Sequence, residues 1–310
     1  MKILITGVHG FVGNNLVTYL APQNEIYGLD IIAPQKEGVI KTYSWSDLDE
    51  GKVPLVDAII HLAGKAHDTK NQAAAEVYFK VNRDLTIKVF DYFTSNAGIK
   101  KFIFFSTAKA AADKIDGILT ENVVPAPVGP YGESKIAAED YILSHMPEGK
   151  AVYIFRPCMI HGPGNKGNLN LLYNVVKKGI PWPLGAFENR RTFTSVENIC
   201  YAVNGVLTKD VPSGVYNMGD DEALSTNELI EEICKSLGKK ARIWKLPKGL
   251  MNGVAKFGGF LHLPLNPERL RKLTENYISS NAKIKAALGV DRMPVDARTG
   301  LQATLKSFRS

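Results

Sequence analysis

The sequence predicts an α/β fold in which helices cover both faces of a doubly wound parallel sheet. Two observations carry this prediction. Short apolar runs recur along the chain and alternate with longer helix-like segments. The first run passes directly into a glycine-punctuated turn and then into an amphipathic stretch. This alternation is typical of a parallel sheet whose strands are buried on both faces. A chain of 310 residues, 45% of them hydrophobic, can bury a sizeable core.

The expected elements follow one another in the order that such a sheet requires. The expected strands are 2–6, 26–29, 58–62, 102–105, 152–155 and 215–218. The expected helices are 11–20, 73–96, 133–144, 169–178, 196–207 and 226–237. In the last of these, Ser225 and Glu228 have the spacing of a capping box, and Gly238 ends the helix.

Composition and charge exclude several classes of protein. The chain has 38 basic and 31 acidic residues, and the net charge of +7 favours an anionic small ligand over a nucleic acid. The three cysteines, Cys158, Cys200 and Cys234, lack the paired spacing of a disulfide framework or a metal site. No run is apolar enough to span a bilayer, and a strand begins directly after Met1. We therefore expect a cytoplasmic protein with no membrane insertion.

A glycine-rich loop joins the first strand to the first helix. Gly7, Gly10 and Gly13 form a GxxGxxG pattern that also contains Phe11 and Val12. Such glycines permit a tight turn and let the backbone and the helix N-terminus approach a pyrophosphate. We expect these five residues to contact a dinucleotide. The alternative is a glycine-rich turn that binds no ligand.

Acidic and small residues at the next strand ends extend this site. Asp30 ends the second strand, where a carboxylate accepts hydrogen bonds from the adenosine ribose and repels a 2′-phosphate, so NAD is favoured over NADP. A plain surface acid is the alternative. The further expected cofactor contacts are Asp47 and Leu48 near the adenine, and Leu62, Ala63 and Gly64 after the third strand. His9 lacks partners at metal-ligand spacing, so no metal site is expected.

Tyr131 and Lys135 lie four residues apart at the start of an expected helix, hence on one helix face. The phenol of a tyrosine is a poor base at neutral pH, because its ordinary pKa is about 10. A fixed lysine ammonium and a nearby nicotinamide cation are expected to lower the pKa of Tyr131. Tyr131 could then take a hydroxyl proton while a hydride leaves for the cofactor.

These motifs together resemble the extended short-chain dehydrogenase/reductase family, in particular its nucleotide-sugar epimerase and dehydratase branch. The resemblance covers nearly the whole chain and implies a Rossmann-type fold with NAD as cofactor. It rests on the glycine loop, Asp30, HLAG at 61–64, Asn82, Phe105-Ser106-Thr107 and YGESK at 131–135. It implies that Thr107 hydrogen-bonds the reacting hydroxyl, that Asn82 and Ser106 line the cofactor site, and that Lys135 holds the nicotinamide ribose.

The resemblance continues beyond the tyrosine. Residues 156–164 resemble an RPxxxYGPG stretch, with Pro157 beside the nicotinamide and His161 in place of the usual tyrosine. Asn168 and Arg191 resemble residues that meet the nucleotide diphosphate, which a guanidinium engages in fork geometry. The family's RDF pattern favours Arg191 over Arg190. The alternative is an exposed basic pair.

The same interpretation of the sequence divides the chain into two parts. An NAD-binding Rossmann domain is expected over 1–165, with some later segments returning to it, and a smaller α/β substrate-binding region over 166–310. The apolar segment 250–265 is expected to be a lid or packing helix, because it lacks the strongly basic polar face of a membrane-surface helix. The resemblance also implies a homodimer, formed by the helices at 73–96 and 133–144.

The residues after Thr107 restrict which of the family's reactions is expected. Sugar 4,6-dehydratases of the family carry an Asp-Glu pair where this chain has Ala108-Lys109, so dehydration is disfavoured. The resemblance implies an NAD-dependent 4-epimerase of a UDP-hexose or UDP-N-acetylhexosamine, in bacterial surface-polysaccharide biosynthesis. Two alternatives stay open: an NAD(P)H-dependent 4-keto-nucleotide-sugar reductase and a catalytically inactive dinucleotide-binding sensor.

Overall fold

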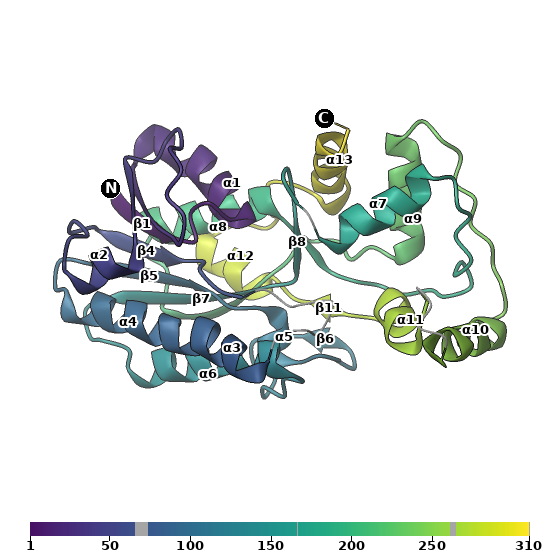
Figure 1. Cartoon of the computed structure of the whole chain (residues 1–310), viewed down its shortest axis with the longest axis horizontal. Helices are drawn as coiled ribbons and strands as arrows, with labels where there is room; N and C mark the ends of the chain where they lie inside the picture. The colour runs from purple at the N-terminus through teal and green to yellow at the C-terminus, as the bar shows by residue number, and fades with distance from the viewer. Residues whose placement is uncertain (66–73, 166, 261–264, 310) are drawn as a thin grey trace.

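A seven-stranded parallel sheet forms one half of the molecule (Figure 1). The computed structural model describes residues 1–65, 74–165, 167–260 and 265–309. Across the sheet the strands lie in the order β3 (Lys41–Tyr43), β2 (Glu25–Leu29), β1 (Lys2–Thr6), β4 (Ala58–His61), β5 (Lys101–Phe105), β7 (Ala151–Pro157) and β10 (Gly214–Met218). The strand order reverses direction between β1 and β4, and ligands bind at the carboxyl ends of strands beside such a switch point. The predicted doubly wound α/β fold is confirmed.

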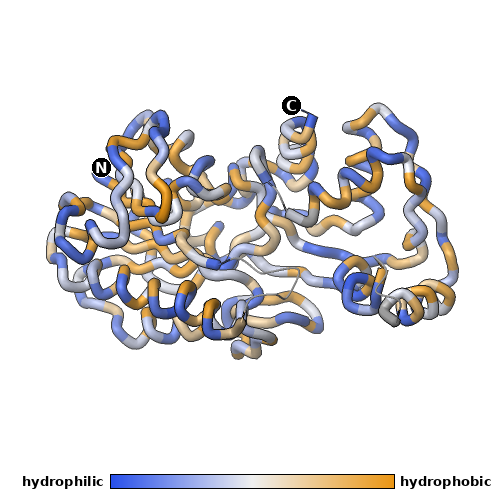
Figure 2. Tube along the Cα trace, viewed as in Figure 1, coloured by the Kyte–Doolittle hydropathy of each residue, from blue (hydrophilic) through white to orange (hydrophobic). Residues whose placement is uncertain are grey.

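Successive residues of each strand face opposite sides of the sheet, and both sides are covered. In β1, Ile3 and Ile5 join a core with α1 (Phe11–Leu20), α8 (Val196–Thr208) and α12 (Ala282–Leu288). Leu4, between them, joins the opposite core with α2 (Trp45–Asp49), α4 (Leu85–Ser95) and α6 (Pro130–Ser144). Figure 2 shows these apolar strands between two helix layers whose outer faces are largely hydrophilic.

A third core organises the other half of the molecule. It contains residues of α7 (Asn168–Lys177), α9 (Thr226–Ser236), α10 (Lys248–Phe260), α11 (Pro267–Thr274) and α13 (Ala297–Ser307). Two small parallel sheets lie between the halves: β8 (Met159–His161) with β9 (Phe193–Ser195), and β6 (Ile118–Leu119) with β11 (Ile278–Ser279). Because α8, β10 and α12 return to the large sheet, the halves interleave in sequence. The boundary at residue 165 stays a prediction.

The long helix expected at 73–96 is built from three pieces. It contains α3 (Ala75–Tyr78), a π-helical turn (Phe79–Asp84) and α4, whereas Ala73 lies outside the described residues. A π turn admits one extra residue per turn and occurs frequently at functional sites. Here it contains Asn82, and hydrophobic periodicity gave no sign of it.

The other expected elements agree with the structure to within a few residues, and the capping box of Ser225 and Glu228 is confirmed. The elements absent from the prediction are β3, β6, β8, β9, β11, a 3₁₀ turn (Ala21–Gln23), α2, α5 (Ala108–Ala111), α12 and α13. The region expected as a lid or packing helix contains α10, and residues 261–264 lie outside the described part. Within the described residues, no helix has the length and apolarity to cross a membrane.

Candidate active site

The glycine loop between β1 and α1 packs tightly against the start of the helix. Gly7 has a φ of 68°, and the Gly10 amide donates to its carbonyl at 3.0 Å. A Cβ on Gly13 would lie only 2.6 Å from the carbonyl oxygens of Gly7 and Val8. Within the described residues, no side chain caps the helix at its N-cap residue, Gly10. The first-turn amides of α1, where Phe11 and Val12 lie, are therefore positioned like those that bind phosphate in dinucleotide folds.

Replacing Gly13 by Ala is expected to destabilise the chain by about 1–3 kcal/mol and to weaken NAD binding, because rigid backbone oxygens must shift to admit the methyl group. The control is Gly253→Ala on α10, where a Cβ meets no atom within 4 Å. Chemical denaturation and NAD titration of both variants measure the effects. Equal stability and equal NAD affinity in the two variants would contradict this reading of the loop.

Asp30 lies at the end of β2, beside this loop. Its two carboxylate oxygens accept from the His9 amide at 3.1 Å and the Ile31 amide at 2.7 Å. Each oxygen keeps further acceptor capacity, so the carboxylate is fixed in place and still able to accept from a ribose. Asp47 instead caps α2: its hydrogen bonds with Ser44 lower the pKa of its carboxyl group. Leu48 is buried in the core.

His61, in the HLAG segment, is a neutral structural residue. Burial, with the nearby Lys135 charge, lowers the pKa of its imidazole to about 3. Its Nδ1 contacts Thr6 Oγ1 at 2.7 Å and its Nε2 contacts Thr86 Oγ1 at 2.9 Å. Because Thr86 donates to the Asn82 carbonyl, His61 Nε2 donates to Thr86 and Nδ1 accepts from Thr6.

Thr6 also holds the backbone that follows His61. The Leu62 and Ala63 amides donate to Thr6 Oγ1 at 3.2 and 3.0 Å. This chain of hydrogen bonds through two hydroxyls and an imidazole fixes the end of β4. Leu62, Ala63 and Gly64, which follow it, are the residues expected to contact the cofactor.

Asn82 joins three parts of the site. Its side chain is fully buried, accepts from the Lys65 amide at 2.7 Å and donates to Ser134 Oγ on α6 at 3.0 Å. A Cβ on Gly64 would lie 3.0 Å from Asn82 Oδ1 and 3.2 Å from Lys135 Nζ. The structure thus brings the HLAG segment, the π turn and α6 together at Gly64.

Tyr131 lies in the first turn of α6, which begins at Pro130, three residues earlier than predicted. Its phenol hydrogen-bonds the side chain of Thr107, and its ring meets the Tyr78 ring edge-on at 6.4 Å. Burial is the largest influence on the pKa of Tyr131 and raises it, while the bond with Thr107 acts in the opposite direction. In the chain itself the cost of burying a phenolate prevails, and the predicted lowering by Lys135 together with a bound nicotinamide cation stays a prediction.

Lys135 is buried one helical turn beyond Tyr131. Its Nζ donates to the Phe105 carbonyl at 2.8 Å and lies 4.8 Å from the centre of the Phe104 ring. Burial lowers the pKa of Lys135 to about 8, and the Glu139 carboxylate acts against that change. Gly132 lets α6 approach α5, since a Cβ there would lie 2.7 Å from the Lys109 carbonyl oxygen. Tyr131, Thr107 and Lys135 thus meet where β5 ends.

A buried charge cluster supports these residues, and it was missed in the sequence. The Arg156 Nε donates to both oxygens of Glu139, to Oε1 at 3.1 Å and to Oε2 at 2.9 Å, and Nη2 donates to Oε2 at 2.6 Å. Ser106 donates to the same carboxylate, so its hydroxyl is engaged there. Burial raises the pKa of Glu139, although Arg156 and Ser106 oppose this. The i, i+4 spacing of Lys135 and Glu139 was the available signal.

On the substrate side, the two adjacent arginines differ. Arg190 is exposed and pairs with Glu228 at 2.9 Å, whereas Arg191 is partly buried and donates to the Lys272 carbonyl on α11. Burial lowers the pKa of Arg191, which lies in the field of Glu275 and of Cys158. Pro157 ends β7 immediately before Cys158. Asn168 begins α7, but its side chain lies outside the part of the chain that the structure describes.

An ion-pair network joins α5 to α11 near Arg191. Asp113 binds Lys109 at 2.7 Å and Arg271 at 3.3 Å, and Arg271 also binds Glu275 at 3.0 Å. Burial raises the pKa of Asp113, but the hydrogen bonds and charges of Lys109 and Arg271 outweigh burial and lower it overall. Asp113 is therefore held ionised and paired, which makes it unsuited to donate a proton.

His161 is buried between two partners. Its Nδ1 contacts Thr304 Oγ1 at 2.9 Å, and its Nε2 lies 3.5 Å from Asp220 Oδ2. Among the described residues, no group of three or more His, Cys, Asp or Glu side chains is placed to hold a metal ion.

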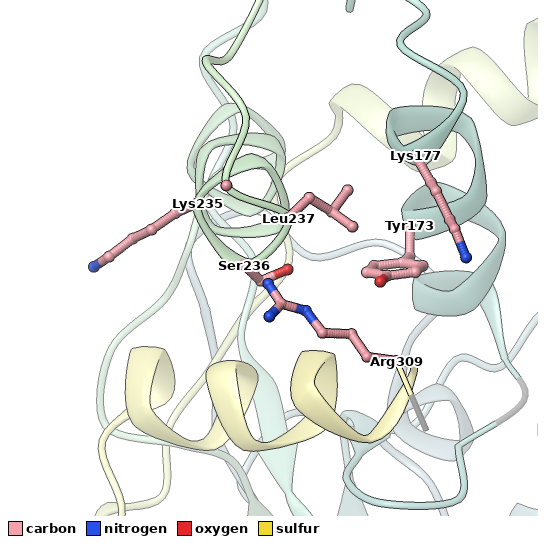
Figure 3. A pocket seen from close by; sticks show the side chains of 7 residues that line it. Tyr173, Lys177, Lys235, Ser236, Leu237 and Arg309 are labelled. Carbon is pink, nitrogen blue, oxygen red and sulfur yellow. The ribbon is translucent and has the colours of Figure 1, made fainter.

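A cavity of about 500 Å³ has a lining that includes none of the site residues described above (Figure 3). Its lining includes Tyr173, Lys177, Lys235, Leu237 and Arg309, at the C-terminal ends of α7, α9 and α13. Basic side chains at such helix ends complement the helix dipole, and Figure 3 shows Lys235 pointing away from the cavity. This cavity is not part of the candidate active site.

Comparison with known proteins agrees with this geometry. The family model described as the NAD dependent epimerase/dehydratase family matches residues 3–219. The UDP-glucose 4-epimerase of Vibrio cholerae is 30% identical over 267 residues, which cover 79% of this chain and 78% of the relative. The N-acetyl-alpha-D-glucosaminyl-diphospho-ditrans,octacis-undecaprenol 4-epimerase of Escherichia coli O157:H7 is 28% identical over 295 residues, covering 92% of this chain and 84% of the relative.

The fold is also found among solved structures. The Bordetella bronchiseptica enzyme WbmG in complex with NAD and UDP superposes with a TM-score of 0.78 at 20% identity, covering 100% of this chain and 95% of that chain. The resemblance inferred from the sequence and the choice of NAD as cofactor are confirmed by the family match. The chain belongs to the NAD dependent epimerase/dehydratase family.

Proposed function

We propose that this chain is an NAD-dependent 4-epimerase of a UDP-hexose or UDP-N-acetylhexosamine, acting through transient oxidation at C4 of the sugar. The observation that carries the proposal is the contact of Tyr131 with Thr107 beside the buried Lys135, at the carboxyl end of β5. A phenol, a hydroxyl and an ammonium in this arrangement suit removal and return of one hydroxyl proton.

The residues at the sheet's switch point fit NAD. The uncapped N-terminus of α1 suits the pyrophosphate, and Asp30 keeps acceptor capacity for a ribose. Gly64 leaves the approach to Asn82 and Lys135 free of a side chain. When bound there, NAD supplies the hydride acceptor and donor. We propose that the predicted contacts at Phe11, Val12, Leu62, Ala63, Ser106 and Pro157 complete this site, and that Asp47 and Leu48 lie near the adenine.

The chain's own residues would handle the proton. Thr107 hydrogen-bonds the C4 hydroxyl and Tyr131, and the Tyr131 oxygen accepts the hydroxyl proton as C4 becomes a ketone. The positive charge of Lys135 favours the Tyr131 phenolate that accepts this proton. Tyr131 returns the proton when C4 is reduced from its opposite face. We propose that Arg191, with Asn168, binds the diphosphate, because a guanidinium engages two phosphates in fork geometry.

The residues after Thr107 favour epimerisation over dehydration. Ala108 and Lys109 carry no carboxyl group, and the nearby Asp113 is ionised and paired with Lys109 and Arg271. Elimination of water would need an acid and a base beyond Tyr131. Both relatives compared above are named as 4-epimerases.

The reaction is tested by incubating the purified chain with NAD and UDP-glucose, UDP-N-acetylglucosamine or N-acetylglucosaminyl-diphospho-undecaprenol. We expect the C4 epimer of a UDP-sugar in the NMR spectrum. Epimerisation of the lipid-linked sugar alone would move the substrate to the class named for the Escherichia coli relative. A product formed only from a 4-keto sugar with NAD(P)H would establish the reductase, and NAD binding with no turnover would indicate the sensor.

Turnover is expected to fall as the pH rises through about 8, because Lys135 loses its charge there. The lowered pKa also means that the folded chain binds fewer protons than the unfolded chain between about 8 and 10.5. This group alone therefore makes stability rise with pH in that window, so the loss of rate is not unfolding. A pH–rate profile of the parent and of Lys135→Arg, whose charge persists, measures the effect. Identical alkaline limbs would contradict the role of Lys135.

Two further predictions belong to this proposal. We propose that the chain is a homodimer formed by α6 and by the helix that comprises α3, the π turn and α4. We also propose that it acts in the cytoplasm on a nucleotide sugar for polysaccharide biosynthesis. Sedimentation of the purified chain tests the dimer.

A further inference from the structure

Helix α10 has two apolar faces, of which the chain buries one. Met251 and Ala255 belong to the third core, and α10 contacts α11. Leu250, Val254 and Phe257 are 55%, 46% and 62% exposed. Their spacing of four and three residues places them on one helix face. The exposed stripe is therefore a continuous apolar strip.

All the charged residues in the segment around this stripe are basic. Residues 233–267 contain no Asp or Glu, and their seven basic residues are Lys235, Lys239, Lys240, Arg242, Lys245, Lys248 and Lys256. The net charge of the whole chain is +7. Trp244, 54% exposed, lies in the same segment and adds an aromatic ring of the kind found at membrane–water interfaces. α10 itself carries only two lysines, so the segment before it supplies the rest of the positive charge.

This segment occupies one end of the molecule. Figure 1 shows α10, and the chain that leads into it from α9, at the end farthest from the seven-stranded sheet. Figure 2 shows hydrophobic and hydrophilic residues alternating along α10. A flat surface could meet this end without touching the glycine loop or the outer faces of α4 and α6.

We propose that the α10 stripe, formed by Leu250, Val254 and Phe257, docks this protein on an anionic lipid bilayer. An amphipathic helix lies in the interface when aliphatic and aromatic side chains enter the acyl boundary and basic side chains meet anionic headgroups. A second copy of this chain is a poorer occupant. Its own α10 stripe is surrounded by the same basic segment, and the two positively charged segments would repel each other. A nucleic acid would leave the apolar stripe uncovered.

The docking would orient the candidate active site. α11 packs on α10, and the Lys272 carbonyl of α11 accepts from Arg191, the proposed diphosphate-binding residue. The docked end is thus one helix away from the proposed substrate side. The inference goes beyond the proposed function and does not rest on it.

Vesicle flotation of the full chain tests the proposal, with phosphatidylcholine vesicles compared with vesicles that also contain phosphatidylglycerol. We expect binding to the anionic vesicles and its loss at high salt. The variant Leu250→Ser with Phe257→Ser is expected to bind at least about tenfold more weakly. The control Leu171→Ser, on the exposed face of α7 at 63% exposure, is expected to bind like the parent.

Two charge-reversal variants complete the experiment. Lys245→Glu with Lys256→Glu is expected to weaken binding at least about tenfold, whereas Lys100→Glu with Lys178→Glu changes the net charge equally and leaves most of the binding in place. All four variants should turn over a soluble nucleotide sugar at the parental rate, so failure here is distinguishable from failure of the proposed function. Absence of vesicle binding by the parent, or equal weakening by variants and controls, overturns the proposal. So does self-association of the parent that Phe257→Ser abolishes, because a second copy would then be the occupant.

Discussion

Replacing Tyr131 by Phe is expected to lower turnover of the nucleotide sugar about a hundred- to ten-thousandfold, with little change in folding or NAD affinity. The variant loses only the phenolic oxygen, which hydrogen-bonds Thr107 and is proposed to accept the C4 hydroxyl proton. The edge-on packing of the ring against Tyr78 is retained. Initial rates and NAD titration of the parent and the variant measure the two quantities separately.

Tyr141→Phe is the matched control. Tyr141 lies on the same helix, and its phenol donates to the Asp91 carboxylate at the surface at 2.7 Å, far along α6 from Tyr131. This variant is expected to keep the parental rate. Equal rates for Tyr131→Phe and Tyr141→Phe would remove Tyr131 from the catalytic step.

Replacing Arg156 by Met is expected to cost about 3–5 kcal/mol of the free energy of unfolding. Glu139 is fully buried, and Arg156 satisfies both of its oxygens. The variant therefore leaves a carboxylate in the core for which Ser106 is the remaining polar partner among the described residues. Chemical denaturation of the parent and the variant measures the change in the free energy of unfolding. The double variant Arg156→Met with Glu139→Gln is expected to recover part of the loss, because no uncompensated charge remains.

Arg190→Met is the control for this substitution. Its guanidinium also pairs with a carboxylate, that of Glu228, but at the surface, where such a pair contributes about 0–1 kcal/mol. A cost for Arg156→Met as small as that of Arg190→Met would show that the buried pair does not hold β7 against α6.

The sequence predicted those parts of the fold and candidate site that local chemistry determines. Gly7 and Gly13 are required by backbone contacts within one loop, and Asp30 and the Tyr131–Lys135 pair occupy fixed distances from strand ends. Each signal lies within a few consecutive residues. The predicted strand positions are reliable for the same reason, since strands covered on both faces of a parallel sheet are near-continuous apolar runs. The edge strand β3 (Lys41–Tyr43) lacks such a run and was missed.

The remaining features depend on contacts between distant segments. Glu139 and Arg156 meet only when α6 packs beside β7, and the i, i+4 spacing of Lys135 and Glu139 does not by itself indicate that Glu139 is buried. The raised pKa of Tyr131 is likewise a consequence of burial. The exposure of Leu250 and Phe257 could not be told from core packing, because their spacing is that of an ordinary buried helix face.

Transfer of deuterium from a UDP-sugar labelled at C4 tests the central claim most directly. UDP-N-acetylglucosamine carrying deuterium at C4 is incubated with the chain and NAD, and the product is analysed by NMR and mass spectrometry. Reversible oxidation at C4 predicts the C4 epimer with deuterium still at C4 and no consumption of added cofactor. An epimer that has gained solvent hydrogen at C4, or a product that consumes one NADH or NADPH for each sugar, would contradict it.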